Sequence, residues 1–213
     1  MQHSVSGRER RERKMAEKAV SLKSVKELME VQERSFKSFV QMLMDNFTSR
    51  IERLDFEFDL IGISETKIKN GNEPLLNVHL NGYNFEFVPT PLVCGGVGLY
   101  IKDNLKYSIL EQKSTCAFQA LWIEIHLPKK KNNICGIIYR QHNSPESFLE
   151  YFNEALDKLT SRNHPTYILG DFNTNLLNSE TSNFAYDFLT LLQSYFFAPT
   201  IDKPTTCFIH KFT

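Results

Sequence analysis

The chain has 213 residues, 25 acidic and 25 basic side chains, and an apolar content of 41% that includes 17 phenylalanines. This composition excludes a disordered or fibrous protein, and the balanced charge gives no overall attraction to a polyanion. The four cysteines lack metal-ligand spacing, and neither a secretory leader nor a membrane-spanning run is visible. We expect a protein with reduced thiols that is nuclear or cytoplasmic and not secreted, with no membrane partner and no small-molecule cofactor.

The N-terminal quarter of the chain has a different pattern from the rest. Residues 1–20 mix arginine, lysine and glutamate, which favours a disordered tail over a nuclear-import or nucleic-acid arm. Residues 21–54 repeat apolar side chains with a helical period, and Ser24 and Glu27 have the spacing of a capping box. We expect one long amphipathic helix there. Its apolar seam, within residues 22–54, would mediate coiled-coil self-association, pack on the next domain or stay solitary.

From residue 56 the chain reads as strands separated by turns and occasional helices. Apolar runs and alternating patterns predict strands at residues 58–64, 83–88, 95–101, 118–127, 134–139 and 195–201, and another leading to residue 171. A cap at Ser144 followed by proline predicts one helix, and residues 182–192 predict a second. Hairpins with few crossover helices indicate an α/β sandwich, in which sheets pack together and helices cover their outsides.

Two predicted core strands end in polar side chains. Glu65 ends the first, and Asp171 ends another, with Asn173 two residues further on. If these oxygens meet at one edge of a sheet, they suit Mg²⁺, which needs only one or two protein carboxylates. Acidic residues at strand ends are more often solvated loop starts, so this pattern alone does not establish a site.

Four motifs in order strengthen this interpretation: residues 63–67 (ISETK), 95–100 (GGVGLY), 138–140 (IYR) and 169–173 (LGDFN). Together they resemble the endonuclease/exonuclease/phosphatase superfamily, and most closely its branch in LINE-type (non-LTR) retrotransposons, which nicks target DNA ahead of a reverse transcriptase. The resemblance covers residues 56 to 208. It implies a four-layer α/β sandwich over 56–213, hydrolysis of DNA phosphodiesters, and Mg²⁺ or Mn²⁺ as the cofactor.

The resemblance also implies a role for each site residue. Glu65 matches the metal-binding glutamate, and Tyr139 matches the tyrosine that contacts the scissile phosphate. Asp171 matches the aspartate that orients or deprotonates the attacking water, and Asn173 the amide that steadies the phosphate. Arg140 looks like part of the substrate groove. For Tyr139 a core aromatic remains the alternative, and for Arg140 a surface salt bridge.

The sequence departs from the family pattern at both ends. The family's first strand carries a metal-binding asparagine, but the corresponding region here is the predicted helix, and Asn46 in mid-helix is not credited with the role. The family closes with a Ser-Asp-His segment, which we do not find, and His210 lacks the preceding Ser-Asp. We therefore expect a truncated domain with an exposed sheet edge and weak or absent hydrolysis.

Two other functions remain open. One is a non-catalytic binding module that associates through the coiled coil. The other is a phosphatase or phosphodiesterase of the same superfamily. His126, His142 and His164 lie on strands or in turns, and we expect them to be structural or exposed instead of catalytic.

Overall fold

The computed structural model describes residues 58–71, 78–142, 147–176, 180 and 182–200, and eight residues near the N-terminus, 26, 27, 30, 31, 34, 38, 42 and 49. The chain divides into two compact units, Met1–Leu54 and Asp55–Thr213. The eight described residues of the first unit all have helical backbone. The predicted tail, Ser24 and the apolar seam residues lie outside the described residues. Within the described part of the chain, no helix is long and apolar enough to cross a membrane.

The described residues of the second unit form two sheets and two helices. The three-stranded antiparallel sheet has the order β1 (Leu60–Ser64), β3 (Val97–Lys102), β2 (Tyr83–Val88). The four-stranded sheet has the order β4 (Lys106–Ser114), β5 (Phe118–His126), β6 (Asn133–Arg140), β7 (Thr166–Asp171). Helix α2 (Ser147–Thr160) connects β6 to β7, and α3 (Asn183–Ser194) follows β7.

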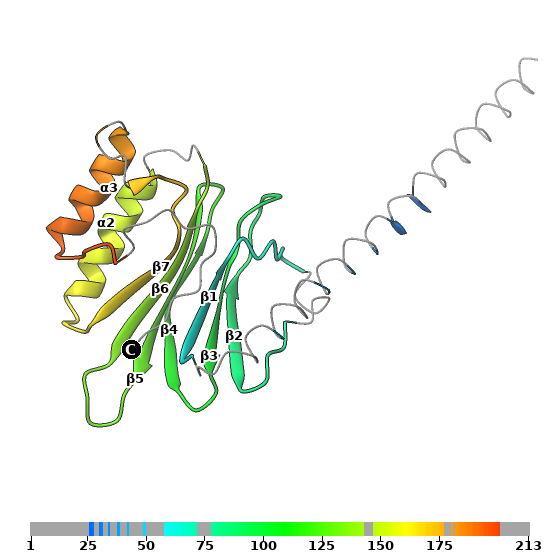
Figure 1. Cartoon of the computed structure of the whole chain (residues 1–213), viewed down its shortest axis with the longest axis horizontal. Coiled ribbons are helices and arrows are strands. Elements are labelled where there is room, and N and C mark those ends of the chain that lie inside the picture. Colours follow the sequence, from blue (N-terminus) through cyan, green and yellow to red (C-terminus); the bar gives the residue numbers. More distant parts are fainter. Residues whose placement is uncertain are drawn as a thin grey trace, which may run out of the picture. The chain divides into compact units, whose positions relative to one another are not determined.

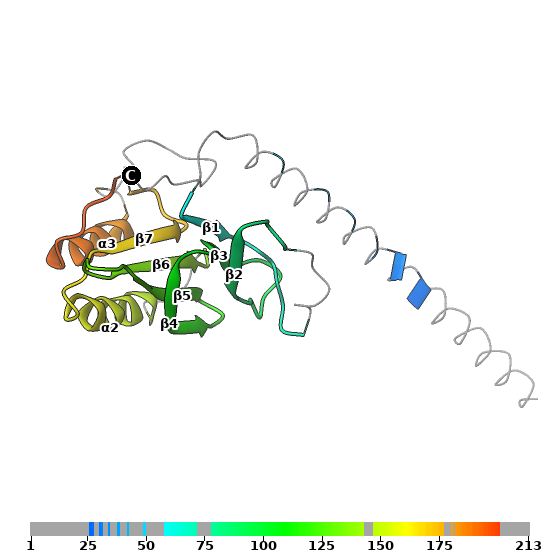
Figure 2. The same cartoon turned by 90° about the horizontal axis from the view of Figure 1, so that it is seen from below.

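The four-stranded sheet lies between the helices and the other sheet. Figure 1 shows α2 and α3 on one of its faces and β1, β3 and β2 on the opposite side, and Figure 2 shows the same order of layers. Strand β5 is buried on both faces: Leu121 and Ile123 pack between the sheets, whereas Ala120 and Trp122 pack against the helices. Burial on both faces explains the nearly continuous apolar run of this strand.

Trp122 fixes α2 against the sheet. Its ring covers Gly136 on the neighbouring strand, where a Cβ atom would overlap the indole. Its Nε1 donates a hydrogen bond of 3.1 Å to the hydroxyl of Tyr151 in α2. A buried indole N–H needs such a partner, so this contact anchors the helix as well as filling space.

Strands β6 and β7 run parallel, in contrast to every other pair in the described sheets. The crossover through α2 returns the chain to the same end of the sheet. The carboxyl ends of both strands therefore meet at one edge, with Tyr139 opposite Asp171. The candidate site therefore lies at the carboxyl ends of β6 and β7.

The α/β sandwich predicted from the sequence is confirmed, and the predicted strands before residue 172 are all present. The predicted strand at 195–201 is wrong over its described residues: Tyr195 caps α3, Phe196 has a φ of 62°, and the N–H of Phe197 turns back to Leu192 O at 2.9 Å. Strand β4 was not predicted. It is an edge strand with mostly exposed side chains and a bulge between Ile109 and Glu111, so its sequence shows no clear alternation.

Candidate active site

The parallel end of β6 and β7 is the foundation of the candidate site. Tyr139 and Asp171 are directly paired there, and Gly170 precedes the aspartate with a φ of 139°. A Cβ atom at position 170 would overlap the carbonyl oxygen of Ile138 on the neighbouring strand. Glycine therefore lets the backbone of β7 approach β6 closely just before it presents Asp171.

Glu65 reaches the same place from the other sheet. It follows β1, with a φ of 57°, and its Oε1 accepts a hydrogen bond of 3.0 Å from the Tyr139 hydroxyl. Burial raises the pKa of Tyr139, and the hydrogen bond and negative charge of Glu65 raise it further, while the side chain of Asn173 acts in the opposite direction. The phenol therefore stays protonated at neutral pH. Its ring packs in the core between the sheets, and its oxygen faces the carboxylate.

A two-glycine loop at residues 95 and 96 holds the backbone that follows Glu65. The N–H of Thr66 donates to Gly96 O at 3.2 Å, and the N–H of Lys67 donates to Gly95 O at 2.9 Å. A Cβ atom on Gly95 would lie 3.1 Å from a ring carbon of Tyr139. The two glycines thus allow a close backbone approach, which holds the segment carrying Glu65.

Gln119 supports this loop, a role that the sequence analysis did not predict. The residue is only 2% exposed, its Oε1 accepts from Gly96 N at 2.9 Å, and its Nε2 donates to Thr115 O at 2.7 Å. It is paired across the sheet with Tyr139. A glutamine at a buried position of an apolar strand is the signal that could have marked it, because buried polar groups need partners.

Asp171 and Asn173 form a tight turn after β7. The backbone N–H of Asn173 donates to Asp171 Oδ1 at 2.9 Å, and the φ of Asn173 is 46°. Asparagine tolerates this left-handed conformation better than most residues. Its side-chain Nδ2 donates to Arg140 O at 2.7 Å, which ties the turn to the end of β6.

Arg140 lies under this turn. The residue is 5% exposed, and its Nε and Nη2 donate to the carbonyl oxygens of Phe172 and Asn173 at 2.6 and 2.8 Å. The sequence predicted a place in the substrate groove or in a surface salt bridge. The structure gives the guanidinium backbone partners inside the protein, which argues against a surface salt bridge, whereas a place in the substrate groove stays a prediction.

The structure thus brings Glu65, Tyr139, Asp171 and Asn173 to one edge. Among the described residues no group of three or more His, Cys, Asp or Glu side chains could enclose a metal ion. Glu65 is nevertheless exposed and follows directly from a strand end. Mg²⁺ is commonly held by one or two carboxylates together with water and substrate phosphate, so this donor set fits that mode.

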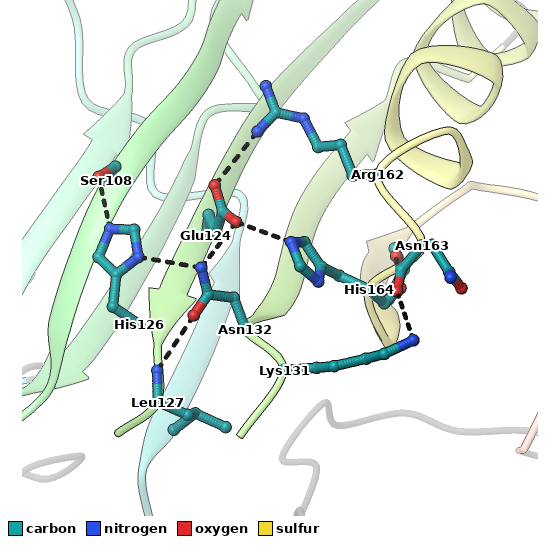
Figure 3. A network of polar contacts seen from close by, with 10 residues as sticks. Ser108, Glu124, His126, Leu127, Lys131, Asn132, Arg162, Asn163 and His164 are labelled. Atoms are coloured by element: carbon teal, nitrogen blue, oxygen red, sulfur yellow. Dashed lines mark hydrogen bonds and ion pairs between the residues drawn. The ribbon is translucent and has the colours of Figure 1, made fainter. Parts of the chain in front are cut away.

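Two of the described histidines lie away from this edge. His126 and His164 belong to a polar network around Glu124, at the other end of β5 (Figure 3). That end is about 20 Å from the start of the strand at the usual rise per residue. His142 is exposed after β6. His210 and Asn46 lie outside the described residues.

Comparison with known proteins identifies the family. The model of the Endonuclease/Exonuclease/phosphatase family matches residues 40–208, starting within the segment where the sequence predicted the N-terminal helix. A search of the curated proteins finds no match. One similar solved structure is the catalytic domain of APE2 from Xenopus laevis, with 18% identity and a TM-score of 0.38 over 60% of this chain and 53% of that chain. The chain therefore spans about half the length of that domain.

The family match extends over most of the chain and includes the sheet edge described above. Its members are nucleases and phosphatases, so hydrolysis of phosphate esters is the general chemistry associated with this fold. The chain belongs to the endonuclease/exonuclease/phosphatase family.

Proposed function

We propose that the chain is a DNA endonuclease domain of LINE-type retrotransposon origin that hydrolyses phosphodiesters slowly. The observation that carries the proposal is the hydrogen bond between Tyr139 and Glu65, because it joins two sheets at the point where Asp171 and Asn173 also emerge. Carboxylates, a protonated phenol and an amide at one edge supply a base, hydrogen-bond donors and oxygen ligands for phosphoryl transfer.

Each residue has a distinct part in the proposed reaction. The Asp171 carboxylate orients the attacking water and takes its proton as the new P–O bond forms. The bond to the leaving sugar oxygen breaks, and that oxygen takes a proton from solvent water. When substrate binds, the single hydroxyl proton of Tyr139, which points to Glu65 in the structure, turns to a phosphoryl oxygen. Asn173 donates a second hydrogen bond as negative charge develops on the phosphoryl group. Glu65 would hold a divalent cation, the cofactor generally used by nucleases of this family. When bound, Mg²⁺ or Mn²⁺ supplies Lewis-acid stabilisation of that charge.

The low rate follows from the donor set of the described residues. Glu65 is the carboxylate that we assign to the cation, while Asp171 is engaged by the backbone of Asn173 and assigned to the water. One carboxylate leaves most of the coordination sphere to water and substrate, so we expect the cation to bind weakly until substrate phosphate joins the site.

A plasmid-nicking assay tests the proposal. The full chain is incubated with supercoiled DNA and Mg²⁺ or Mn²⁺, beside Asp171→Asn and Glu65→Gln variants and the control Glu111→Gln, which changes a residue on edge strand β4. We expect slow nicking that the first two changes abolish and the control leaves intact. Nicking that is equal in all four proteins would come from a contaminant and would refute the assignment.

The same protein preparation separates the endonuclease from its superfamily alternatives. An inositol phosphate, a nucleotide, a phosphomonoester and a small phosphodiester are offered under identical conditions. Turnover of one of these that depends on Asp171, with no nicking of DNA, would replace the endonuclease by a phosphatase or phosphodiesterase.

Self-association through residues 22–54 and a nuclear or cytoplasmic location stay predictions. Val31 and Met42, the described apolar residues of the N-terminal segment, are about half exposed (50% and 51%). Sedimentation velocity of the full chain at increasing concentrations measures self-association, and a monomer throughout would rule out the coiled-coil module.

A further inference from the structure

Arg140 and the turn at residues 171–173 hold one another through reciprocal hydrogen bonds. The guanidinium donates from Nε to Phe172 O at 2.6 Å and from Nη2 to Asn173 O at 2.8 Å. In the opposite direction, Asn173 Nδ2 donates to Arg140 O at 2.7 Å. The side chain of Arg140 thus fixes the main chain of the turn, and its backbone carbonyl fixes the side-chain amide of Asn173.

The surroundings of the guanidinium keep it in this position. Its central carbon lies 3.8 Å from the centre of the Phe184 ring in α3, a cation–π contact that strengthens when water is excluded. Phe172 in the turn packs on Phe188 of the same helix, with ring centres 4.8 Å apart. Helix α3 therefore covers both the arginine and the turn that it binds.

The geometry of the turn explains why an arginine is suited to this position. Residues 172 and 173 lie beyond the end of β7, where Asn173 has a left-handed backbone. Carbonyls that are withdrawn from water need donors. A planar guanidinium satisfies the carbonyls of both residues at once and can still stack on an aromatic ring, whereas the single ammonium of lysine cannot reproduce this arrangement.

Asp171 depends on the same arrangement. Its Oδ1 accepts from the backbone N–H of Asn173, so a displacement of that residue also changes the orientation of the carboxylate. The charge of Asp171 favours the cationic form of Arg140 and so opposes the effect of burial, which lowers the pKa of the guanidinium.

We infer that Arg140 is a positioning residue, which holds the Asp171 carboxylate and the Asn173 amide in their reactive orientation and does not itself bind the substrate. The effect on hydrolysis rests on the proposed function, but the effect on the turn does not. A variant that moves the turn should lower kcat and leave both KM and the salt dependence of DNA binding unchanged. A lost phosphate contact would weaken binding and reduce the salt slope by about one.

Arg140→Lys in the full chain tests the inference, with Arg162→Lys as the matched control because it changes an arginine at the other end of the sheet. Protein labelled with ¹⁵N-asparagine reports on the turn without any activity, and Asn173→Ser assigns the Asn173 signals. We expect Arg140→Lys to shift the side-chain and backbone amide signals of Asn173 and to speed their hydrogen exchange about ten-fold or more. The control should change neither.

Kinetics on the same variants give the second measurement. A misplaced reacting group typically costs about 10² in rate, so we expect kcat to fall by about that factor in Arg140→Lys while KM changes less than about two-fold. Addition of guanidinium ion to Arg140→Ala should restore part of both the Asn173 signals and the rate. Unchanged Asn173 signals in Arg140→Lys, or a rise in KM with a smaller salt slope, would overturn the positioning role.

Two further outcomes remain decisive. If the wild-type chain hydrolyses no phosphodiester, the proposed function fails, while the Asn173 signals still decide whether Arg140 holds the turn. If Arg140→Lys does not fold, Phe184→Leu removes the ring over the guanidinium and retains both of its donors. It should then disturb the Asn173 signals more weakly, and an undisturbed turn would refute the part assigned to the ring. Arg140→Gln then tests the guanidinium itself by the same signals, and unchanged Asn173 signals in that variant would refute the inference.

Discussion

The hydroxyl of Tyr139 donates a 3.0 Å hydrogen bond to Glu65 Oε1, and this bond joins β6 of the four-stranded sheet to the segment after β1 of the three-stranded sheet. The two residues are 74 positions apart in the chain. Their meeting depends on the packing of the two sheets and on the glycine loop that holds the backbone beyond Glu65. The hydrogen bond therefore reports on the relative position of both sheets.

Tyr139→Phe should separate the chemical role of the hydroxyl from the structural role of the ring. We expect the free energy of unfolding to fall by only about 1 kcal/mol, because one hydrogen bond is lost and the ring remains. If the proposed function holds, the nicking rate should fall about 10²- to 10³-fold. Tyr107→Phe is the matched control, since it removes a similar 2.7 Å bond to Glu86 away from the site. Nicking by Tyr139→Phe at the wild-type rate would exclude the hydroxyl from the reaction.

Gly170→Ala should prevent β7 from pairing correctly at the site. The new methyl group would overlap the carbonyl of Ile138, and the φ of 139° is itself unfavourable for alanine. We expect a loss of at least about 3 kcal/mol in urea unfolding, or failure to fold. Gly82→Ala also has a positive φ but meets no atom within 4 Å, so its cost should be about 1–2 kcal/mol. Equal costs for the two variants would show that the close approach of β6 and β7 is not required.

Alkaline conditions should destabilise the fold through buried Tyr100. Burial raises the pKa of this phenol from 10.0 to about 12. Between these values the unfolded chain loses the proton and the folded chain keeps it, so stability present below pH 10 is lost as the pH rises towards 12. The contribution is at most about 1.4 kcal/mol for each pH unit. Urea unfolding of wild type and Tyr100→Phe from pH 9 to 11 measures it, and equal slopes would contradict the assignment.

Glu124 should stabilise the end of the sheet opposite the candidate site. A hydrogen bond from Asn132, followed by the charges of Arg162 and His164, lowers the pKa of its carboxyl group (Figure 3). The stabilisation is present above the pKa of the unfolded chain and is lost as the pH falls through the lower folded value. At pH 7 we expect Glu124→Gln to cost about 1–3 kcal/mol in urea unfolding.

The difference between Glu124→Gln and wild type should disappear in acid, where the wild-type carboxyl is protonated. Arg162→Ala is a useful comparison because its side chain is 46% exposed, and its ion pair should contribute no more than about 1 kcal/mol. A difference for Glu124→Gln that stays constant down to pH 3 would show that the charge is not the cause.

Much of this fold could be predicted because its central strands leave a strong pattern. Residues 83–88 were predicted as a strand with the observed bounds, and the apolar run before Asp171 is β7. Glu65 and Asp171 both follow strand ends, which indicated that they share one edge. In the structure Tyr139 links them, since it binds Glu65 and pairs with Asp171. The spacing of apolar residues and the ends of strands depend on residues that are close in the chain, so they can be predicted from the sequence.

The remaining features depend on contacts between distant residues. The Arg140 guanidinium turns under the loop because it binds the ring of Phe184 and the carbonyls of residues 172 and 173. All three partners lie more than thirty positions further along the chain. The support that Gln119 gives to Gly96 is equally non-local. Strand β4 could not be predicted for another reason. An edge strand needs no continuous apolar face, and its bulge interrupts the alternation of apolar and polar side chains.

The alternation of β6 has a consequence for tolerated changes in chain length. Tyr139 points into the core between the sheets, and the next residue, Arg140, points to the helices. An insertion or deletion of one residue within this strand would exchange the two faces, so that the phenol would leave Glu65 and the guanidinium would enter the apolar core. We expect natural variants of this domain to vary in length outside the strand and to keep the tyrosine–arginine pair in phase with the start of β6.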